Sequence, residues 1–197
     1  MFIELTDHLR CPAEHAESFL VLLPDGMAGR RVASGSLGCP VCGRVVTVAD
    51  GNLDFGGDPP PAGETLLTPD GVAALLGLQG PGGYLAILGG AGATVEPLAA
   101  ALPGIRLVLV NPPGAVADSD LGSVVRSART PLKTSSMRGV VVSADHAGLR
   151  HWVDAAVDAV LPGNPVIVEG APIERPDLAI VAQSPGLWVG RKIAGSA

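Results

Sequence analysis

All three cysteines of the chain lie in its first quarter, and they form two close pairs with one histidine. Cys11 is followed by His15 at Cys-x3-His spacing, and Cys39 by Cys42 at Cys-x2-Cys spacing. Three thiolates and one imidazole are a donor set of the tetrahedral zinc site. Four protein ligands leave no open position for a reacting water, so the sequence predicts a structural zinc ion rather than a catalytic one.

A second histidine is also a candidate for the fourth zinc ligand. His8 lies just before Cys11 and is an alternative to His15, or else a polar helix residue without a metal. We favour His15 because its longer gap from Cys11 leaves room for a knuckle-like turn. The alternative to any metal site is three unrelated thiols and a surface histidine. The paired spacings, and the proline after both Cys11 and Cys39, favour zinc.

The remainder of residues 1–55 favours a small β-rich module, a zinc ribbon. Asp50-Gly51 is a strong hairpin-turn signal between two short apolar stretches. A module of this size buries too little apolar surface to fold alone, so the metal is expected to contribute much of its stability. The expected elements are strands at 2–5, 18–23, 45–48 and 52–55, with Thr6 as the N-cap of a short helix.

Residues 56–67 are rich in glycine and proline and predict a semi-rigid linker. From residue 68 onward apolar runs alternate with helical patterns, which predicts a shortened, Rossmann-like α/β unit (68–197) with a mainly parallel sheet. Thr68 and Pro69 form a typical helix start. The other expected elements are strands at 84–88, 105–110, 124–127, 139–143, 166–168, 178–181 and 187–189, and helices at 93–102 and 146–161.

A glycine-rich turn, Gly89-Gly90-Ala91-Gly92, follows the expected strand 84–88 and precedes a helix. Such a turn lets a nucleotide-like ligand approach the backbone and the helix N-terminus. A tight strand–helix connection explains the same residues without any ligand, and on the turn alone it is the simpler interpretation.

Composition argues against some functions and favours others. The net charge of −6 and the aromatic content of 3% argue against generic nucleic-acid binding, which needs basic and stacking side chains. No uninterrupted apolar run reaches about 18 residues, and the N-terminus lacks the layout of a signal peptide, so we expect a cytoplasmic protein without a membrane span. Charged residues make up only 16%, which fits a surface covered by a protein partner or by a second copy. An Ala/Gly/Val-rich composition explains that figure equally well.

The stretches LRCPAEH and LGCPVCGRVVTVADGNLDF resemble the small zinc-ribbon activator subunit of tRNA and protein methyltransferases. Members of that family share the Cys-Pro start, the Cys-Pro-x-Cys-Gly knuckle and the strand–Asp-Gly–strand hairpin. The resemblance covers residues 1–55 and implies a module that contacts a methyltransferase. His15 stands where a cysteine is more usual, a change that zinc accepts.

Residues 68–170 resemble, in the right order, segments of a class I S-adenosylmethionine methyltransferase. GYLAILGGAGA is similar to the first glycine motif, IRLVLVN to the second strand and VLPGNPVIVEG to the fifth. The resemblance implies S-adenosylmethionine as a cofactor, with Gly89, Gly90, Gly92 and Asn111 as the residues that would bind it.

Three carboxylates that the methyltransferase family usually carries are missing. The glycine-motif strand contains no acid, Asn111 replaces the acid that binds the ribose hydroxyls, and Arg138 stands at the head of the fourth strand. Since a charged hydrogen bond contributes about 1.5–3 kcal/mol, we expect weakened binding of S-adenosylmethionine. Asn111-Pro112-Pro113 follows the wrong strand for the amino-methyltransferase motif and lacks its aromatic residue, so it is interpreted as a rigid turn.

The function predicted from these features is a zinc-binding accessory or structural protein with a degenerate, non-catalytic methyltransferase-like part that acts through protein contacts. The alternative is a small S-adenosylmethionine-dependent methyltransferase with a built-in zinc-ribbon activator. No catalytic residue is assigned, because a polar helix start explains Asp145, His146 and His151 as well as an acid–base pair does. Trp152 and Trp188 are expected in the core or at an interface.

Overall fold

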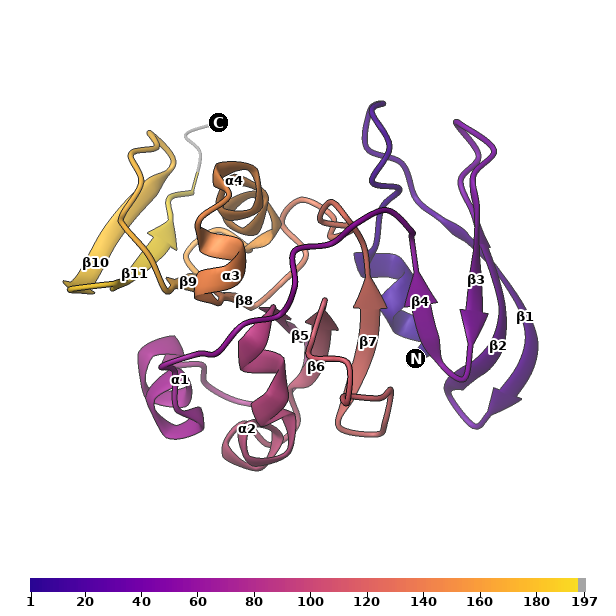
Figure 1. Cartoon of the computed structure of the whole chain (residues 1–197), viewed down its shortest axis with the longest axis horizontal. Coiled ribbons are helices and arrows are strands. Elements are labelled where there is room, and N and C mark those ends of the chain that lie inside the picture. The colour runs from indigo at the N-terminus through magenta and orange to yellow at the C-terminus, as the bar shows by residue number, and fades with distance from the viewer. Residues whose placement is uncertain (195–197) are drawn as a thin grey trace.

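The computed structural model describes residues 1–194, so the last three residues of the predicted 68–197 unit lie outside the described part. Its strands form one continuous eleven-stranded sheet in the order β1-β2-β3-β4-β7-β6-β5-β8-β9-β11-β10 (Figure 1). The strands are β1 (Val21–Ala28), β2 (Arg31–Gly38), β3 (Val45–Ala49), β4 (Asn52–Asp54), β5 (Tyr84–Leu88), β6 (Arg106–Val110), β7 (Gly122–Arg126), β8 (Gly139–Val142), β9 (Pro165–Val168), β10 (Leu178–Ser184) and β11 (Leu187–Lys192).

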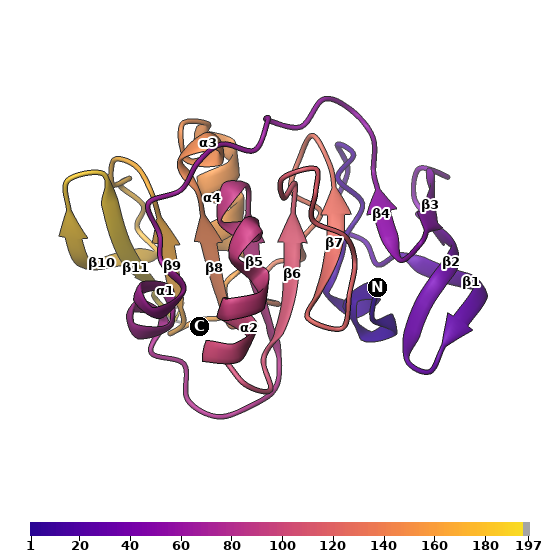
Figure 2. The same ribbon diagram turned by 60° about the horizontal axis from the view of Figure 1, so that its bottom comes forward.

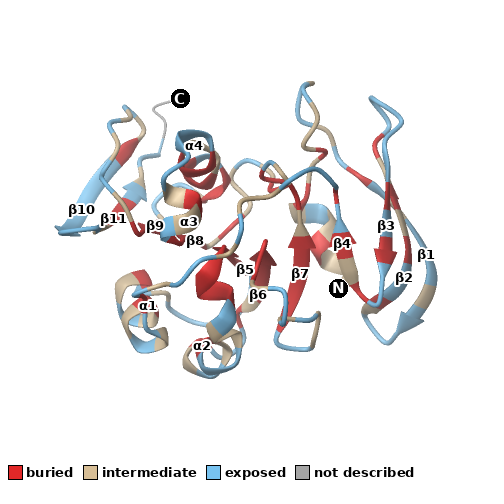
Figure 3. Ribbon diagram, viewed as in Figure 1, coloured by how far each residue is buried: buried red, intermediate tan, exposed pale blue. Residues whose placement is uncertain are grey.

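Strands β5 to β9 confirm the predicted α/β unit. They are parallel and adopt the order β7-β6-β5-β8-β9, which is the 3-2-1-4-5 order of a doubly wound sheet. Strands β10 and β11 form the expected hairpin, in which β11 pairs antiparallel with β9 and β10 forms the outer edge. The central strands are buried on both faces, whereas the outermost strands β1 and β10 are largely exposed (Figure 3).

Helices cover both faces of this parallel region (Figure 2). Helices α1 (Pro69–Leu76) and α2 (Val95–Ala101) share one buried cluster with Leu85 and Ile87 of β5. Helix α4 (Arg150–Ala159) packs in a second cluster, on the face to which the alternate residues Ala86 and Leu88 point. The Thr68 hydroxyl accepts from the Gly71 N–H at 3.2 Å, which confirms the predicted start of α1. The expected helix 146–161 is divided into α3 (Ala144–Ala147) and α4.

The predicted strand at 2–5 is wrong. Residues Ile3–His8 form a 3-10 helix, η1, and Thr6 lies inside it rather than capping a helix. Met1, Leu5 and Leu9 are fully buried and belong to the same buried cluster as the apolar residues of α4. The described residues 127–138, between β7 and β8, contain no helix. The N-terminal segment lies alongside them, because the Lys133 N–H donates to the His8 carbonyl at 3.0 Å.

The sheet continues from residues 1–55, which we call the ribbon, into the α/β part. Strand β4 pairs in parallel with β7 through Leu53 opposite Val125, and the Phe55 N–H donates to the Arg126 carbonyl at 2.8 Å. Residues 56–67, which follow β4, contain neither helix nor strand. Strand β2 was missed by the sequence interpretation, because its small and polar residues 33–36 lack an apolar alternation. The ribbon and the α/β part therefore share one sheet and one buried cluster.

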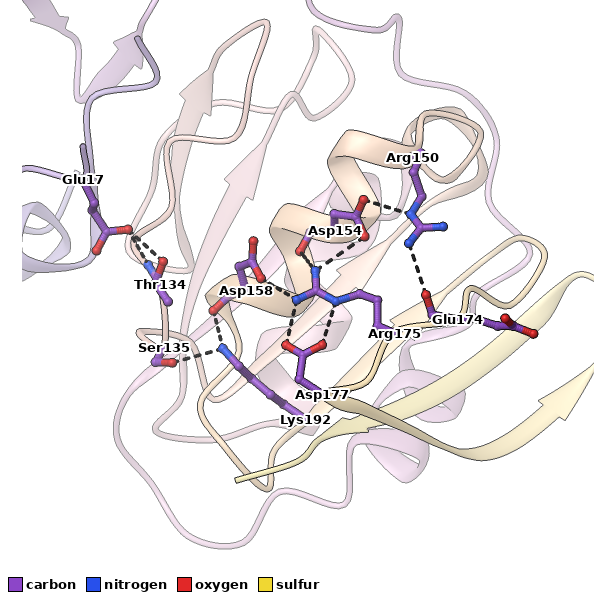
Figure 4. A network of polar contacts seen from close by, with 10 residues as sticks. All are labelled: Glu17, Thr134, Ser135, Arg150, Asp154, Asp158, Glu174, Arg175, Asp177 and Lys192. Atoms are coloured by element: carbon purple, nitrogen blue, oxygen red, sulfur yellow. Dashed lines mark hydrogen bonds and ion pairs between the residues drawn. The ribbon is translucent and has the colours of Figure 1, made fainter. Parts of the chain in front are cut away.

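Arg175 ties α4 to the segment before β10 (Figure 4). Its guanidinium donates to Asp158 at 2.7 Å, to both carboxylate oxygens of Asp177 at 2.7 and 2.8 Å, and to the Asp154 carbonyl at 2.9 Å. The bond from Arg175 is the main reason that the pKa of Asp177 is lowered. None of the described helices has the length and apolar character needed to cross a bilayer.

We expect Arg175→Gln to lower the free energy of unfolding by about 1–3 kcal/mol near neutral pH, since it removes several charged hydrogen bonds. A carboxylate with a depressed pKa stabilises the fold above its unfolded pKa and loses that contribution as pH falls through the lower folded pKa. The deficit of the variant should therefore shrink on acidification below about pH 4, as measured by urea unfolding. The control is Arg150→Gln, an exposed pair with Asp154 four residues on, expected to cost only about 0.3–0.5 kcal/mol. Equal losses in the two variants would contradict this account.

Candidate functional site

Cys11, His15, Cys39 and Cys42 come together in the ribbon, and one ligand atom from each lies within 4.8 Å of the others. The sulfurs of Cys11 and Cys42 are 3.7 Å apart, and the Cys39 sulfur is 3.4 Å from His15 Nε2. A tetrahedral zinc ion with Zn–S bonds of about 2.3 Å separates its sulfurs by about 3.8 Å. The cluster therefore has the donor chemistry and about the size needed to hold a metal ion.

The chain around Cys39 forms the tight turn that such a cluster needs. The Gly43 N–H donates to the Cys39 carbonyl at 3.0 Å, and Gly43 has a φ of 71°, a conformation that favours glycine. Burial opposes ionisation of Cys39, but the N–H groups of Cys42 and Val41 lower the pKa of its thiol to about 7. The turn thus prepares a thiolate, which is the form that binds metal.

His15 is oriented toward the cysteines by its other ring nitrogen. Its Nδ1 lies 2.7 Å from the carbonyl oxygen of Ala16, which leaves Nε2 facing Cys39. His8 lies elsewhere, with Nδ1 at 3.0 Å from the Ser136 carbonyl and its ring against Tyr84. Of the two histidines considered from the sequence, the structure places His15 in the cluster.

The glycine-rich turn lies at the carboxyl edge of the parallel sheet. Gly89, with a φ of 82°, follows β5 and donates its N–H to the Val110 carbonyl at 2.9 Å, directly beside Asn111. The 3-10 helix η2 (Gly90–Thr94) comes before α2, so the expected helix 93–102 starts with a tighter turn. The structure therefore brings Gly89, Gly90, Gly92 and Asn111 to the edge where doubly wound folds bind ligands.

This edge is crossed by residues 63–67 of the chain itself, which we call the strap (Figure 2). The Gly63 N–H donates to Asp145 Oδ2 at 2.8 Å, and the same oxygen accepts from the Gly90 N–H at 3.2 Å. A Cβ atom on residue 90 would overlap the Gly63 carbonyl oxygen. Although burial opposes ionisation of Asp145, the nearby His146 ring and these N–H groups keep its pKa below the usual value.

A second carboxylate fixes the other end of the strap. Glu169 follows β9 and is buried, and its oxygens accept from the Thr65 hydroxyl at 2.7 Å and the Leu66 N–H at 2.6 Å. It also accepts from the Ala144 N–H at 3.2 Å. Sequence reasoning missed these roles of Asp145 and Glu169. The available signal was their position just beyond the apolar strands: Glu169 directly follows β9, and Asp145 lies three residues after the end of β8.

Asn111 is turned into the protein rather than toward the edge. It is 2% exposed with a φ of 52°, and its amide exchanges two hydrogen bonds of 2.9 Å with the backbone of Ser127. Its Nδ2 also lies 3.1 Å from His146 Nε2. The side-chain amide of Asn111 thus connects the ends of β6 and β7 to α3, and its hydrogen-bonding groups are already paired.

Arg138 lies at the opposite, amino edge of the sheet. It precedes β8 and donates to the carbonyls of Gln79 at 2.8 Å and Gly82 at 2.7 Å, which holds the loop between α1 and β5. Its position corrects one part of the sequence interpretation. An acid at residue 138 would not reach a cofactor at the carboxyl edge, so only the other two missing carboxylates bear on cofactor binding. Trp152 and Trp188 are both fully buried, as expected for core residues.

No family model matches the chain, and no curated protein matches it. Solved structures similar to it include the complex of the Haloferax volcanii Trm112 methyltransferase activator with a methyltransferase, at 12% identity and a TM-score of 0.49, covering 65% of this chain and 90% of that one. The N-methyltransferase NodS from Bradyrhizobium japonicum has 16% identity and a TM-score of 0.39, covering 61% and 92%. The antibiotic-resistance methyltransferase Kmr has 16% identity and a TM-score of 0.44, covering 68% and 98%. The mixed α/β fold with its mainly parallel sheet is of the Rossmann type. The three solved structures named above are methyltransferases or a complex that contains one.

Proposed function

We propose that this chain is a zinc-binding accessory or structural protein, in which the methyltransferase-like part no longer binds S-adenosylmethionine and the protein acts through contacts with other proteins. The observation that carries the proposal is the strap. It occupies the carboxyl edge at the glycine turn, and Asp145 already accepts the Gly90 N–H that would face a ligand there.

The chemistry of the edge supports the same conclusion. A cofactor at this position needs an acceptor for its ribose hydroxyls, and the neutral amide of Asn111 is fully engaged with Ser127 and His146. Binding there would require the strap to leave and the hydrogen bonds of Asn111 to break. Both changes cost free energy that the bound ligand must supply.

Zinc is the metal that the donor set favours. Three thiolates and one imidazole in tetrahedral spacing suit Zn²⁺, whereas magnesium and calcium require oxygen ligands. The resemblance of residues 1–55 to zinc-ribbon activators points the same way. None of the three cysteines forms a disulfide, and cysteines that bind a metal suit the reducing cytoplasm, where we place the protein.

Contact with other proteins is supported by an exposed apolar surface on the ribbon. Val21 and Leu23 of β1 and Val45 of β3 lie on the same face of the sheet by strand register, with exposures of 43%, 62% and 67%. An apolar face on an edge strand is typical of a surface that a protein covers. The net charge of −6 disfavours nucleic acid as that partner.

The test is a calorimetric titration of the zinc-loaded chain with S-adenosylmethionine. We expect no binding at about 1 mM ligand, because the edge is filled. The alternative, a small methyltransferase with its own activator module, requires affinity near the micromolar range. Elemental analysis tests the metal independently, with one zinc ion expected per chain.

A further inference from the structure

A cleft lies between the ribbon and the α/β part, beside the loop that joins Cys11 to His15. Two adjoining cavities of about 430 and 590 Å³ share the wall residues Pro12, Ala13, Glu14, Ala128 and Arg129. One wall is thus the loop between the cluster residues Cys11 and His15, and the other is the chain that follows β7. Cavities of this size accommodate small-molecule ligands.

The cleft is positively charged in an acidic chain. Arg10, Arg44 and Arg129 line it, and Glu14 is the one carboxylate among the described lining residues. Formal charges therefore sum to +2 around the cleft, three guanidinium groups against one carboxylate, whereas the whole chain carries −6. The imidazole of His151, from α4, also lines the cleft. A local reversal of charge sign in a concave site favours an anionic ligand.

Two buried polar atoms on lining residues of the cleft have no hydrogen-bond partner among the described residues. They are the hydroxyl of Thr130, a residue that is 4% exposed, and Nε of Arg10, whose side chain as a whole is 33% exposed. An unpaired buried donor costs free energy, so both residues have unused hydrogen-bonding capacity beside the cleft. The nearest acid to Arg10, Glu17, lies at 3.8 Å, and the partner of Arg129 is the largely exposed Glu14 at 2.8 Å.

We propose that this cleft binds a small oxyanion, the phosphate or carboxylate group of a low-molecular-weight ligand. Guanidinium groups bind the paired oxygens of both groups through two parallel hydrogen bonds. Arg10 and Arg129 would supply these bonds. Neither the glycine-rich turn nor the strap lines this cleft, so binding there requires no opening of the strap.

The position of the cleft also couples the anion to the metal. Residues 12–14 form a wall of the cleft and are held in place by Cys11 and His15 on either side. If the metal fixes this loop, it also fixes the cleft, and removal of zinc should abolish anion binding. This coupling rests on the proposed zinc site, whereas the oxyanion site itself does not.

The experiment is calorimetry of the zinc-loaded full chain with inorganic pyrophosphate and, separately, with citrate as a carboxylate probe. We expect saturable binding below about 1 mM for at least one probe, and about tenfold weaker binding for Arg129→Gln and for Arg10→Gln. Arg30→Gln is the matched control, since Arg30 is also an exposed arginine paired with a glutamate but lies outside the cleft. The probe that binds more tightly identifies phosphate or carboxylate as the natural group.

Two results would overturn the oxyanion site: no saturable binding of either probe to protein shown to contain zinc, or binding that Arg129→Gln and Arg10→Gln leave as strong as Arg30→Gln does. Circular dichroism of each variant establishes that it is folded. Because zinc content and S-adenosylmethionine binding are measured separately, failure of this site is distinguishable from failure of the proposed function.

Discussion

Replacing Cys39 with serine, or removing the metal with a chelator, should disrupt the α/β part as well as the ribbon. Structural zinc contributes about 10–16 kcal/mol of apparent binding free energy in zinc-finger peptides, which equals or exceeds the usual domain stability of about 5–15 kcal/mol. The ribbon strand β4 pairs with β7. Met1, Leu5 and Leu9 share one buried cluster with the sheet residues Tyr84 and Val108. Loss of the ribbon would expose this face to water.

Tryptophan fluorescence measures the effect. Trp152 and Trp188 are buried in the α/β part and neither lies in the ribbon, so their emission reports on the part that holds no metal. We expect a red shift and a lowered unfolding temperature after chelation, reversed by added zinc. The matched control is His8→Gln, which should retain zinc, whereas His15→Gln should lose it. Unchanged tryptophan emission in fully zinc-free protein would contradict the shared core.

The second large effect is expected at the strap. Replacing Glu169 with glutamine should lower the free energy of unfolding by about 3 kcal/mol or more, since charged hydrogen bonds contribute about 1.5–3 kcal/mol each. One carboxylate oxygen accepts from the Leu66 N–H, and the other from the Ala144 N–H and the Thr65 hydroxyl. In glutamine an NH₂ group replaces one of the two carboxylate oxygens. In either orientation of the amide this NH₂ group faces a backbone N–H, of Leu66 or of Ala144, and that hydrogen bond is lost.

Urea unfolding measures the loss, and hydrogen exchange of the Leu66 amide measures release of the strap. The matched control is Glu64→Gln, a change of the same kind at an exposed strap residue, expected to stay within about 0.5 kcal/mol of the parent chain. If Glu169→Gln lowers the free energy of unfolding no more than Glu64→Gln does, Glu169 does not anchor the strap.

The parallel strands were predictable because burial on both faces requires continuous apolar runs. Residues Tyr84–Leu88 and Pro165–Val168 are fully buried strands, and both runs stand out between glycines and prolines. Segment 3–8 was misassigned for a physical reason. Its apolar residues also suit a strand, and only the presence of an uncovered sheet face selects a 3-10 helix that buries Leu5.

The Cys/His cluster was predictable from spacing, because the two members of each pair lie within one turn of chain. The strap was not predictable in this way. Asp145 accepts a hydrogen bond from the Gly63 N–H, 82 residues away in the sequence, and Glu169 accepts one from the Leu66 N–H, 103 residues away. Local sequence patterns contain no information on such distant pairs. Asn111 likewise resembles a cofactor residue in sequence, while its contacts with Ser127 and His146 depend on the assembled sheet.

Amide hydrogen exchange of the zinc-loaded chain, with and without about 1 mM S-adenosylmethionine, tests the closed edge most directly. The N–H groups of Gly90 and Leu66 are bonded to Asp145 and Glu169. We predict that both exchange slowly and that S-adenosylmethionine leaves their rates unchanged. Fast exchange of Gly90 and Leu66 in the free protein, slowed by the ligand at micromolar concentration, would contradict the closed edge and support an active methyltransferase.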